Sequence, residues 1–212
     1  MNATDFPDIF GSSFRLPSKV CIVAPGPNGK GHYGEIPGDF FQIAVSKAVL
    51  IPGLNPAVWV MNHSQQDWFA NADQVFNGVR IFGDGAVISD VVLASNASEC
   101  YGFTPPAEHL SADHLPPVDG CIRIGGTVSG CALQIAYNFG AHEILLCGVD
   151  MSGDEYWDGT SNVQATHGPV WNASRSLNLL LHWMTQEKGL KIWTLSPTRL
   201  DVRFFPSSAR SG

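Results

Sequence analysis

Two short groups of polar residues in the middle of the chain carry the side chains best suited to hold a phosphorylated ligand. The first, Gly-Gly-Thr-Val-Ser-Gly over 125–130, places the hydroxyls of Thr127 and Ser129 directly before an apolar segment. The second is Gly-Val-Asp over 148–150, which ends an apolar run. The start of a helix offers N–H groups to an anion, and a carboxylate such as Asp150 accepts hydrogen bonds from a ribose. The pattern therefore predicts a nucleotide-binding unit of the α/β type.

A helix and a strand must position these two groups. The segment 131–139 predicts a helix that Thr127 or Ser129 caps, and Glu143-Ile-Leu-Leu-Cys147 predicts a buried strand. In a parallel sheet, the start of such a helix and the carboxyl end of the next strand lie at the same edge, so both groups are expected at one crevice. Capping is the alternative role for the hydroxyls. For Asp150 the alternative is to hold a loop by accepting from backbone N–H groups.

Further apolar segments along the chain complete a predicted sheet. They predict strands at 19–24, 39–45, 57–61, 78–82, 86–93 and 191–195, and helices at 65–71 and 172–187. This order predicts a single Rossmann-like three-layer α/β/α domain over 19–200 with a mostly parallel sheet. An irregular lead-in (1–18), two irregular lid candidates (94–118 and 151–170) and a C-terminal tail (201–212) are expected around it.

The loop that follows the first predicted strand is rich in proline and glycine, Pro-Gly-Pro-Asn-Gly-Lys-Gly over 25–31. These residues end the strand and expose backbone, so the loop either brings N–H groups to a phosphate or ribose or is a plain surface turn. It lacks the Gly-Lys-Ser/Thr spacing of a Walker loop. At the ends of the next two strands, polar residues either line the same crevice or cap turns. The ligand-binding interpretation assigns Gly26, Pro27, Asn28, Ser46 and Asn62.

Composition and charge narrow the function classes. The 212 residues suffice for one good core, with 44% hydrophobic and 15% charged residues. A net charge of −7 argues against nucleic acid as a partner. No apolar run reaches the roughly 20 residues of a membrane helix, and the first residues do not resemble a signal peptide. With five cysteines and no Cys-x-x-Cys pair, a reduced cytoplasmic protein is expected. His109, Asp113 and His114 fit no familiar ligand spacing, so no metal site is predicted.

Three motifs occur together in one order. They are Gly-Pro-Asn over 26–28, the run from Ser-Gly through an alanine-rich helix to Glu-Ile and Gly-x-Asp over 127–150, and the closing Ile-Trp-Thr-Leu-Ser-Pro over 192–197. Over about 19–200 this order resembles the bacterial lipooligosaccharide sialyltransferases that use CMP-sialic acid. More loosely, it resembles a wider Rossmann-like set that includes the archaeal 6-hydroxymethylpterin pyrophosphokinases.

The resemblance implies a glycosyltransferase that inverts configuration without an essential metal or other cofactor. Its donor would be a CMP-linked or other nucleotide-activated sugar, its acceptor a glycan or small molecule, and its assembly a homo-oligomer, often a tetramer. Asn62, Thr127, Ser129 and Gly130 match donor-binding positions. Tyr156 matches a tyrosine that steadies the leaving phosphate, and His167 matches the catalytic base. Histidine suits that role, since its ordinary pKa lies near neutrality.

Three positions depart from the family pattern. Pro25 and Ser46 stand where the family has asparagines, and Ser152 stands where it has a second tyrosine. Two alternatives therefore stay open. One is a Mg²⁺-dependent pyrophosphokinase or phosphotransferase on the same fold, for which Asp150, Asp154 and Asp158 would be the carboxylates. The other is a nucleotide-binding protein without catalysis, which the substituted asparagines would suit.

Overall fold

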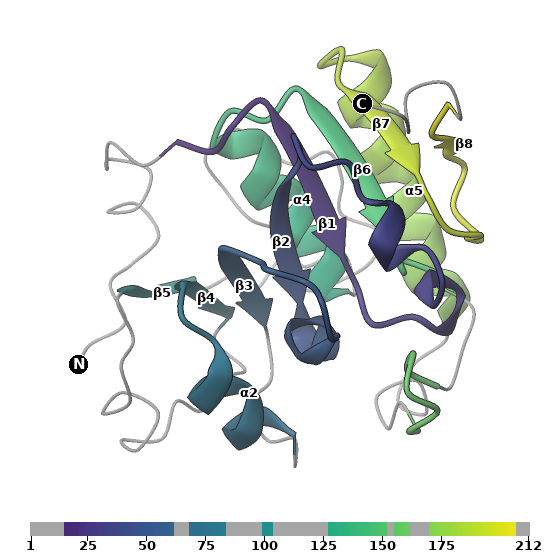
Figure 1. Cartoon of the computed structure of the whole chain (residues 1–212). Helices are drawn as coiled ribbons and strands as arrows, with labels where there is room; N and C mark the ends of the chain where they lie inside the picture. Colours follow the sequence, from purple (N-terminus) through teal and green to yellow (C-terminus); the bar gives the residue numbers. More distant parts are fainter. Residues whose placement is uncertain are drawn as a thin grey trace.

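A computed structural model of the chain describes residues 15–61, 68–83, 99–103, 127–151, 155–161 and 170–206. Within them, eight strands form one sheet in the order β5-β4-β3-β2-β1-β6-β7-β8, and all neighbouring pairs are parallel (Figure 1). The strands are β1 (Lys19–Val23), β2 (Phe41–Val45), β3 (Val58–Met61), β4 (Val79–Gly83), β5 (Glu99–Phe103), β6 (Glu143–Cys147), β7 (Lys191–Thr194) and β8 (Arg203–Phe204). The helices are α2 (Phe69–Val75), α4 (Val128–Asn138) and α5 (Val170–Gln186), with 3₁₀ turns η1 (Pro27–Gly29), η2 (Tyr33–Glu35) and η3 (Ser46–Leu50). The predicted α/β fold with a parallel sheet is confirmed.

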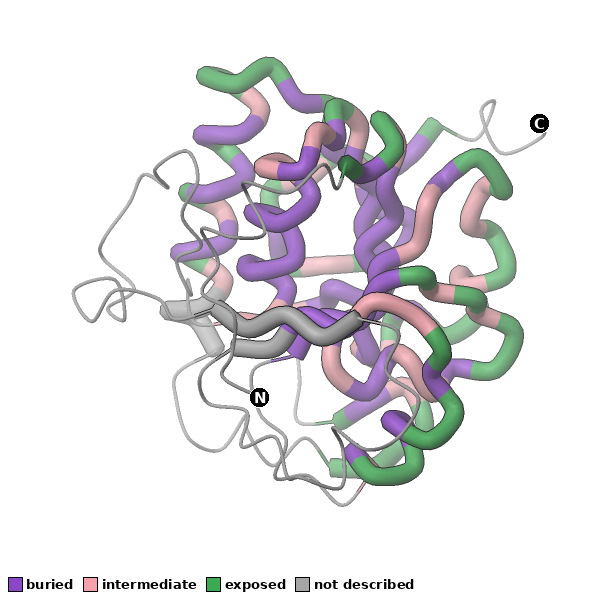
Figure 2. The backbone as a smooth tube through the Cα atoms, turned by 90° about the vertical axis from the view of Figure 1, so that its left-hand side faces the viewer, coloured by how far each residue is buried: buried purple, intermediate pink, exposed green. Residues whose placement is uncertain are grey.

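Both faces of the sheet are buried. Along β1, Val20 and Ile22 belong to the core on one face, whereas Cys21 and Val23 belong to the core on the other. The first core includes residues of α4 and α5, and the second includes residues of α2 and η3 (Figure 1). Burial is continuous along the central strands (Figure 2). Each fully buried Val or Ile contributes about 1.5–3 kcal/mol relative to exposure, so the central strands form a firm base for the loops at their ends.

Helix α4 begins at one of the two predicted caps, and α5 begins two residues before its predicted start but buries the predicted face. The side chain of Thr127 caps α4 by accepting a hydrogen bond from the backbone N–H of Gly130 at 3.0 Å. In α5, the apolar residues at helical spacing are buried, namely Leu177, Leu180, Leu181 and Met184. Helix α4 leads directly into the start of β6, so its last turn lies near the amino edge of the parallel sheet. Its first turn therefore lies at the opposite, carboxyl edge.

Two strands lie in segments for which the sequence predicted irregular structure. β5 falls within the lid candidate 94–118, and β8 falls within the tail 201–212. Both are edge strands of the described sheet, and such strands are short and weakly patterned. The sequence of β5, Glu-Cys-Tyr-Gly-Phe, has no clear alternation, and β8 has only two residues. The predicted strand at 86–93 and most of the lead-in lie outside the described residues.

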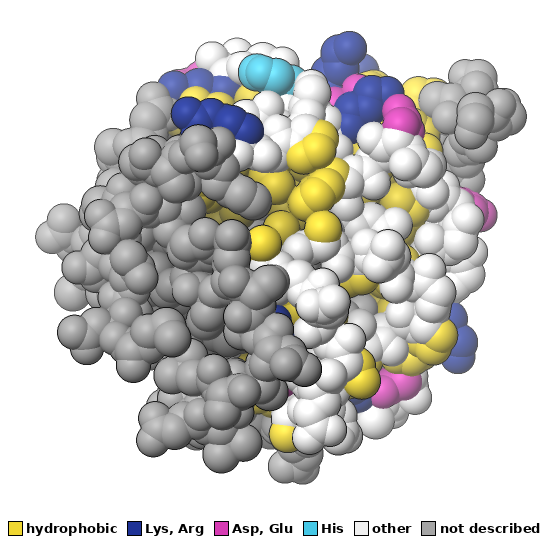
Figure 3. Space-filling view, turned by 60° about the vertical axis from the view of Figure 1, so that its left-hand side comes forward, with side chains coloured by type: hydrophobic (Ala, Val, Ile, Leu, Met, Phe, Trp, Pro, Cys, Tyr) yellow, Lys and Arg dark blue, Asp and Glu magenta, His cyan; other side chains and the backbone are white. Residues whose placement is uncertain are grey.

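The described surface carries charges of both signs. On the face drawn in Figure 3, Lys or Arg and Asp or Glu side chains are interspersed around small apolar areas. Among the described helices, none combines the length and apolar character needed to cross a bilayer. Cys21, Cys131 and Cys147 are buried thiols that form no disulfide bond, and burial raises the pKa of the Cys147 thiol to about 12. That thiol therefore packs as a small apolar group.

Candidate functional site

The chain changes direction across the sheet at β1. Strands β2 to β5 follow in order on one side of β1, whereas β6 pairs with its other side. In parallel α/β sheets, such a switch point opens a crevice outside the carboxyl ends of the two strands, and ligands bind there. Here the segments 24–29 and 148–151, which follow β1 and β6, lie together at the position where such a crevice is expected.

Backbone contacts join these two segments directly. The N–H of Ala24 donates to the carbonyl of Cys147 at 2.8 Å, and the N–H of Gly26 donates to the carbonyl of Gly148 at 2.9 Å. Gly148 has a φ of +73°, and a Cβ atom there would lie 2.2 Å from the carbonyl oxygen of Ala24. A Cβ atom on Gly26 would lie 2.3 Å from the carbonyl oxygen of Gly148. Glycine at both positions lets the two strand ends form one wall of the crevice.

Asp150 is the buried carboxylate of this wall. It is only 3% exposed, and its Oδ2 accepts a hydrogen bond from the backbone N–H of Asn28 at 2.5 Å. Its Oδ1 is buried and has no hydrogen-bond partner in the part of the chain that the structure describes. Burial raises the pKa of Asp150 to about 6, against the opposing effects of the Asn28 N–H and the charge of His32. One oxygen therefore holds a loop, as one alternative predicted, while the other has no partner among the described residues.

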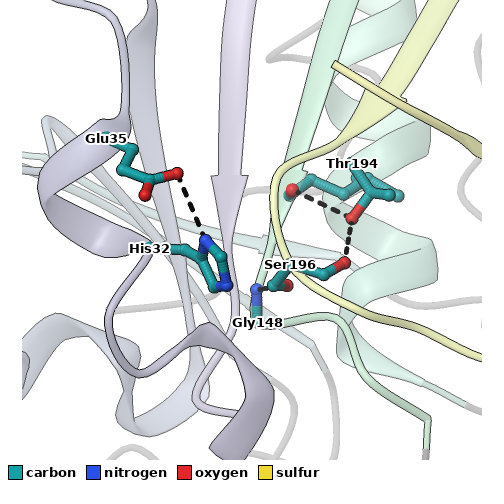
Figure 4. Close-up of polar contacts among 6 residues, drawn as sticks. His32, Glu35, Gly148, Thr194 and Ser196 are labelled. Atoms are coloured by element: carbon teal, nitrogen blue, oxygen red, sulfur yellow. Dashed lines mark hydrogen bonds and ion pairs between the residues drawn. The ribbon is translucent and has the colours of Figure 1, made fainter. Parts of the chain in front are cut away.

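His32 is a second ionisable group at this edge. A ring nitrogen of His32 lies 3.2 Å from the carboxylate of Glu35. Figure 4 shows this pair on one side of the end of β1, with Gly148 and Ser196 at the ends of β6 and β7 on the other side of the view. Ser196 Oγ accepts from the N–H of Gly148 at 2.8 Å. The sequence interpretation missed His32, although its place immediately after the glycine-rich loop was a usable signal.

Lys47 fastens the segment 155–161 to the end of β2. Its ammonium donates to Asp158 Oδ2 at 2.5 Å and to Thr160 Oγ1 at 2.6 Å, and it lies 5.2 Å from the centre of the Tyr156 ring. Partial burial disfavours the charge of Asp158, yet hydrogen bonds from Lys47 and Thr160 lower its pKa to about 2. Lys47 is itself 7% exposed. The sequence interpretation missed this lysine, whose only signal was its position directly after a strand.

The same edge gathers loops from other strands. The N–H of Trp157 donates to the carbonyl of Pro25 at 2.8 Å. Although proline has no N–H to offer a ligand, its carbonyl thus anchors the segment 155–161 to the loop that follows β1. The side-chain amide of Asn28 donates to the carbonyl of Pro197 at 3.2 Å. The loops after β1, β6 and β7 and the segment 155–161 therefore converge.

Two residues at this edge hold a backbone conformation that only glycine adopts readily. Ser46 has a φ of +50° and Met151 has a φ of +53°. Each costs on the order of 1–3 kcal/mol, and strain of this kind clusters at ligand sites. The carbonyl of Ser46 accepts a hydrogen bond from the indole N–H of Trp59 at 2.8 Å, which fixes the turn. The strain lies at the ends of β2 and β6, on both sides of β1.

The predicted site residues fall into three groups. The switch point holds Gly26, Pro27, Asn28 and Asp150. The end of β2 and its partner segment hold Ser46 and Tyr156, and the cap and first turn of α4 hold Thr127, Ser129 and Gly130. Tyr156 is buried, which raises the pKa of its phenol. Asn62, Ser152 and His167 lie outside the described residues, as does Asp154.

Replacing Asp150 with asparagine is expected to stabilise the protein at neutral pH. The raised pKa means that the folded state binds more protons than the unfolded state between about pH 4 and 6. The stability that the folded state gains by binding this proton is complete below about pH 4, and it is lost as the pH rises through 6. Asp150→Asn places no charge in this buried position. We therefore expect its free energy of unfolding to exceed that of the wild type by about 2 kcal/mol at pH 7.5, with a smaller difference at pH 4. Urea unfolding at both pH values measures this.

The control for this prediction is Asp201→Asn, which alters an exposed carboxylate. We expect Asp201→Asn to leave the difference between pH 4 and pH 7.5 as in the wild type. An Asp150→Asn protein that is less stable than the wild type at pH 7.5 would contradict the assignment of a desolvated charge to Asp150.

The sequence matches no protein-family model and no curated protein sequence. A solved structure is similar over most of the chain: the sialyltransferase CstII from Campylobacter jejuni in complex with a substrate analogue, CMP-3FNeuAc. The TM-score is 0.53 at 15% sequence identity, and the match covers 90% of this chain and 87% of that chain. The fold is sialyltransferase-like. At this identity the likeness concerns the fold alone, and the site must be judged on its own residues.

Proposed function

We propose that the protein is a glycosyltransferase that moves a sugar, sialic acid in the first instance, from a CMP-linked donor to the hydroxyl of an acceptor. The observation that carries the proposal is the unpartnered, buried Oδ1 of Asp150 at the switch point of a sialyltransferase-like fold. A buried carboxylate oxygen without a partner is costly. A donor hydroxyl of the ligand would satisfy it.

The nucleotide is held by the edge of the sheet. In this proposal a ribose hydroxyl donates to Asp150 Oδ1, and the phosphate lies toward the first turn of α4. The N–H groups of that turn and the hydroxyls of Thr127 and Ser129 favour an anion. The support from comparison is that the solved structure with this fold holds a CMP-linked substrate analogue.

The chemistry requires a base and a group that steadies the departing phosphate. The acceptor oxygen forms a bond to the anomeric carbon while the bond from that carbon to the phosphate oxygen breaks, and CMP leaves with the electron pair. His167 takes the proton of the acceptor hydroxyl. Tyr156 stabilises the charge that grows on the phosphate. The buried ammonium of Lys47 lies over the Tyr156 ring and keeps it in place.

A panel of nucleotides tests the proposal by thermal unfolding. A ligand that binds only the folded state at 100 times its Kd adds about 2.7 kcal/mol, which raises the Tm of a protein of this size by roughly 5–10 °C. We expect this shift with CMP in the presence of EDTA. We expect Asp150→Asn to show a much smaller shift relative to its own unliganded Tm.

The other outcomes of the panel separate the alternatives. A shift seen only with ATP and Mg²⁺ would overturn the proposal in favour of phosphoryl transfer. Of the three carboxylates that this alternative would use, Asp158 is already paired with Lys47. A shift with CMP but no transfer from CMP-sialic acid to any acceptor in a broad panel would favour a nucleotide-binding protein without catalysis.

A further inference from the structure

An open recess of about 470 Å³ lies between α5 and the segment that follows β7. Five residues line it: Ser174, Arg175, Asn178, Leu179 and Arg199. Four of them come from the middle of α5, where residues four apart stand on the same face of the helix. Arg199 lines the recess from the other side, on the segment that follows β7. None of the described residues assigned above to the nucleotide belongs to this lining.

The two arginines of the recess have no acidic partner in the described part of the chain. Neither the guanidinium of Arg175 nor that of Arg199 is ion-paired or hydrogen-bonded to a described residue. Two cations that share a recess repel each other, and this repulsion is relieved when an anion binds between them. Guanidinium groups are also well matched to carboxylates and phosphates, since their N–H groups form two parallel hydrogen bonds.

The remaining lining favours an anion that carries an apolar or ring portion. Asn178 Oδ1 accepts a hydrogen bond from the backbone N–H of Asp201 at 2.8 Å, so the side-chain NH₂ group remains as a donor. Leu179 is 46% exposed and gives the recess an apolar side. No carboxylate belongs to this lining. Donors, cations and one apolar surface together match an acidic sugar better than a neutral one.

The recess adjoins the switch point through the backbone. The N–H of Arg199 donates to the carbonyl of Asp150 at 3.1 Å, and the hydroxyl of Thr198 donates to the carbonyl of Val149 at 2.6 Å. The segment that carries Arg199 is therefore fixed to the loop that carries the unpartnered carboxylate. A molecule in the recess lies beside, and not within, the crevice assigned to the nucleotide.

We propose that Arg175 and Arg199 bind an acidic group, a carboxylate or a phosphate, of the acceptor molecule. This inference rests on the proposed function, because it assigns the acceptor subsite of that reaction. The acceptor is then an acidic sugar or glycan whose charged group lies in the recess while its reacting hydroxyl reaches the nucleotide crevice.

Binding of simple sugars to the full chain tests the subsite without catalysis. Galacturonic acid, galactose 6-phosphate and galactose differ only at one carbon, and NMR titration of the ¹⁵N-labelled protein measures each affinity. We expect at least one acidic sugar to bind about ten-fold more tightly than galactose and to shift the Arg Nε–H signals. Whichever of the two acidic sugars binds more tightly shows whether the recess prefers a carboxylate or a phosphate. The double variant Arg175→Gln with Arg199→Gln is expected to lose this preference.

Two further variants make the test specific. Arg175→Lys keeps the positive charge but loses the planar guanidinium. We therefore expect its affinity for the acidic sugar to fall by only about two- to five-fold, less than in the double variant. Arg203→Gln removes an exposed arginine outside the recess and is expected to change nothing. Equal binding of all three sugars, or an acidic preference that survives in the double variant, would overturn the subsite.

The proposed function is judged by a separate readout. The double variant should show the same Tm shift with CMP as the wild type, because its substitutions lie outside the nucleotide crevice. If CMP produced no Tm shift in the wild-type protein, the glycosyltransferase proposal would be overturned. The sugar titration would still test the recess.

Discussion

Replacing His167 with alanine is expected to lower the rate of sugar transfer by about 10²- to 10⁴-fold while CMP binding is retained. The acceptor hydroxyl must lose its proton as its oxygen bonds to the anomeric carbon, and a positioned base contributes a rate factor of this size. Histidine has an ordinary pKa of about 6.5, so it can accept the proton near neutral pH. His167 lies outside the described residues, and the expectation rests on its position in the sequence and on the proposed reaction.

Single-turnover transfer from CMP-sialic acid to the acceptor panel measures this loss. The matched control is His182→Ala, which alters an exposed histidine on α5 and should leave transfer unchanged. The acidic limb of the pH–rate profile should also disappear in His167→Ala. Transfer by His167→Ala at the wild-type rate would show that another group is the base. His32, beside Asp150 at the switch point, would then be replaced with alanine as the next variant.

Replacing Gly148 with alanine is expected to lower the free energy of unfolding by about 3 kcal/mol or more. The substitution adds the cost of a positive φ, about 1–2 kcal/mol, to the cost of a steric clash, about 1–3 kcal/mol. The clash is with backbone, since the new Cβ atom would lie 2.2 Å from the carbonyl oxygen of Ala24. Relief would require the ends of β1 and β6 to separate. We therefore also expect CMP binding to weaken.

Urea unfolding measures the loss, and Gly53→Ala separates its two causes. Gly53 has a φ of +84°, yet no atom lies within 4 Å of a Cβ built there. Its replacement should cost only the conformational term, about 1 kcal/mol. Gly148→Ala and Gly53→Ala proteins of equal stability would contradict the tight approach of the two loops.

Local signals in the sequence were enough to predict the central part of the fold. β6 has the predicted bounds, and β1 ends one residue before the predicted end, because buried parallel strands are compact apolar runs. Thr127 acts as the helix cap because capping depends on neighbours within three residues. The placement of Asp150 at the switch point also followed, since a residue directly after a strand lies at the edge of the sheet.

Long-range contacts could not be predicted in the same way. Lys47 and Asp158 are 111 positions apart, and no local pattern links a lysine after one strand to an aspartate in a distant loop. Likewise, the sequence left two roles open for Asp150, and only the geometry assigns one oxygen to the N–H of Asn28. The left-handed conformation of Ser46 had no signal, because serine is not typical of such positions.

The loops that follow β1 and β7 meet at one edge of the sheet, and this contact affects how the protein folds during synthesis on the ribosome. Asn28 reaches Pro197 across 169 positions of sequence. This edge of the sheet is therefore incomplete until the segment after β7 has emerged, and before β6 emerges β1 lacks a neighbour along one side. The nascent chain must keep that open strand edge from pairing with other chains. A ligand of this crevice can therefore stabilise the fold only after the segment that contains Pro197 has been synthesised.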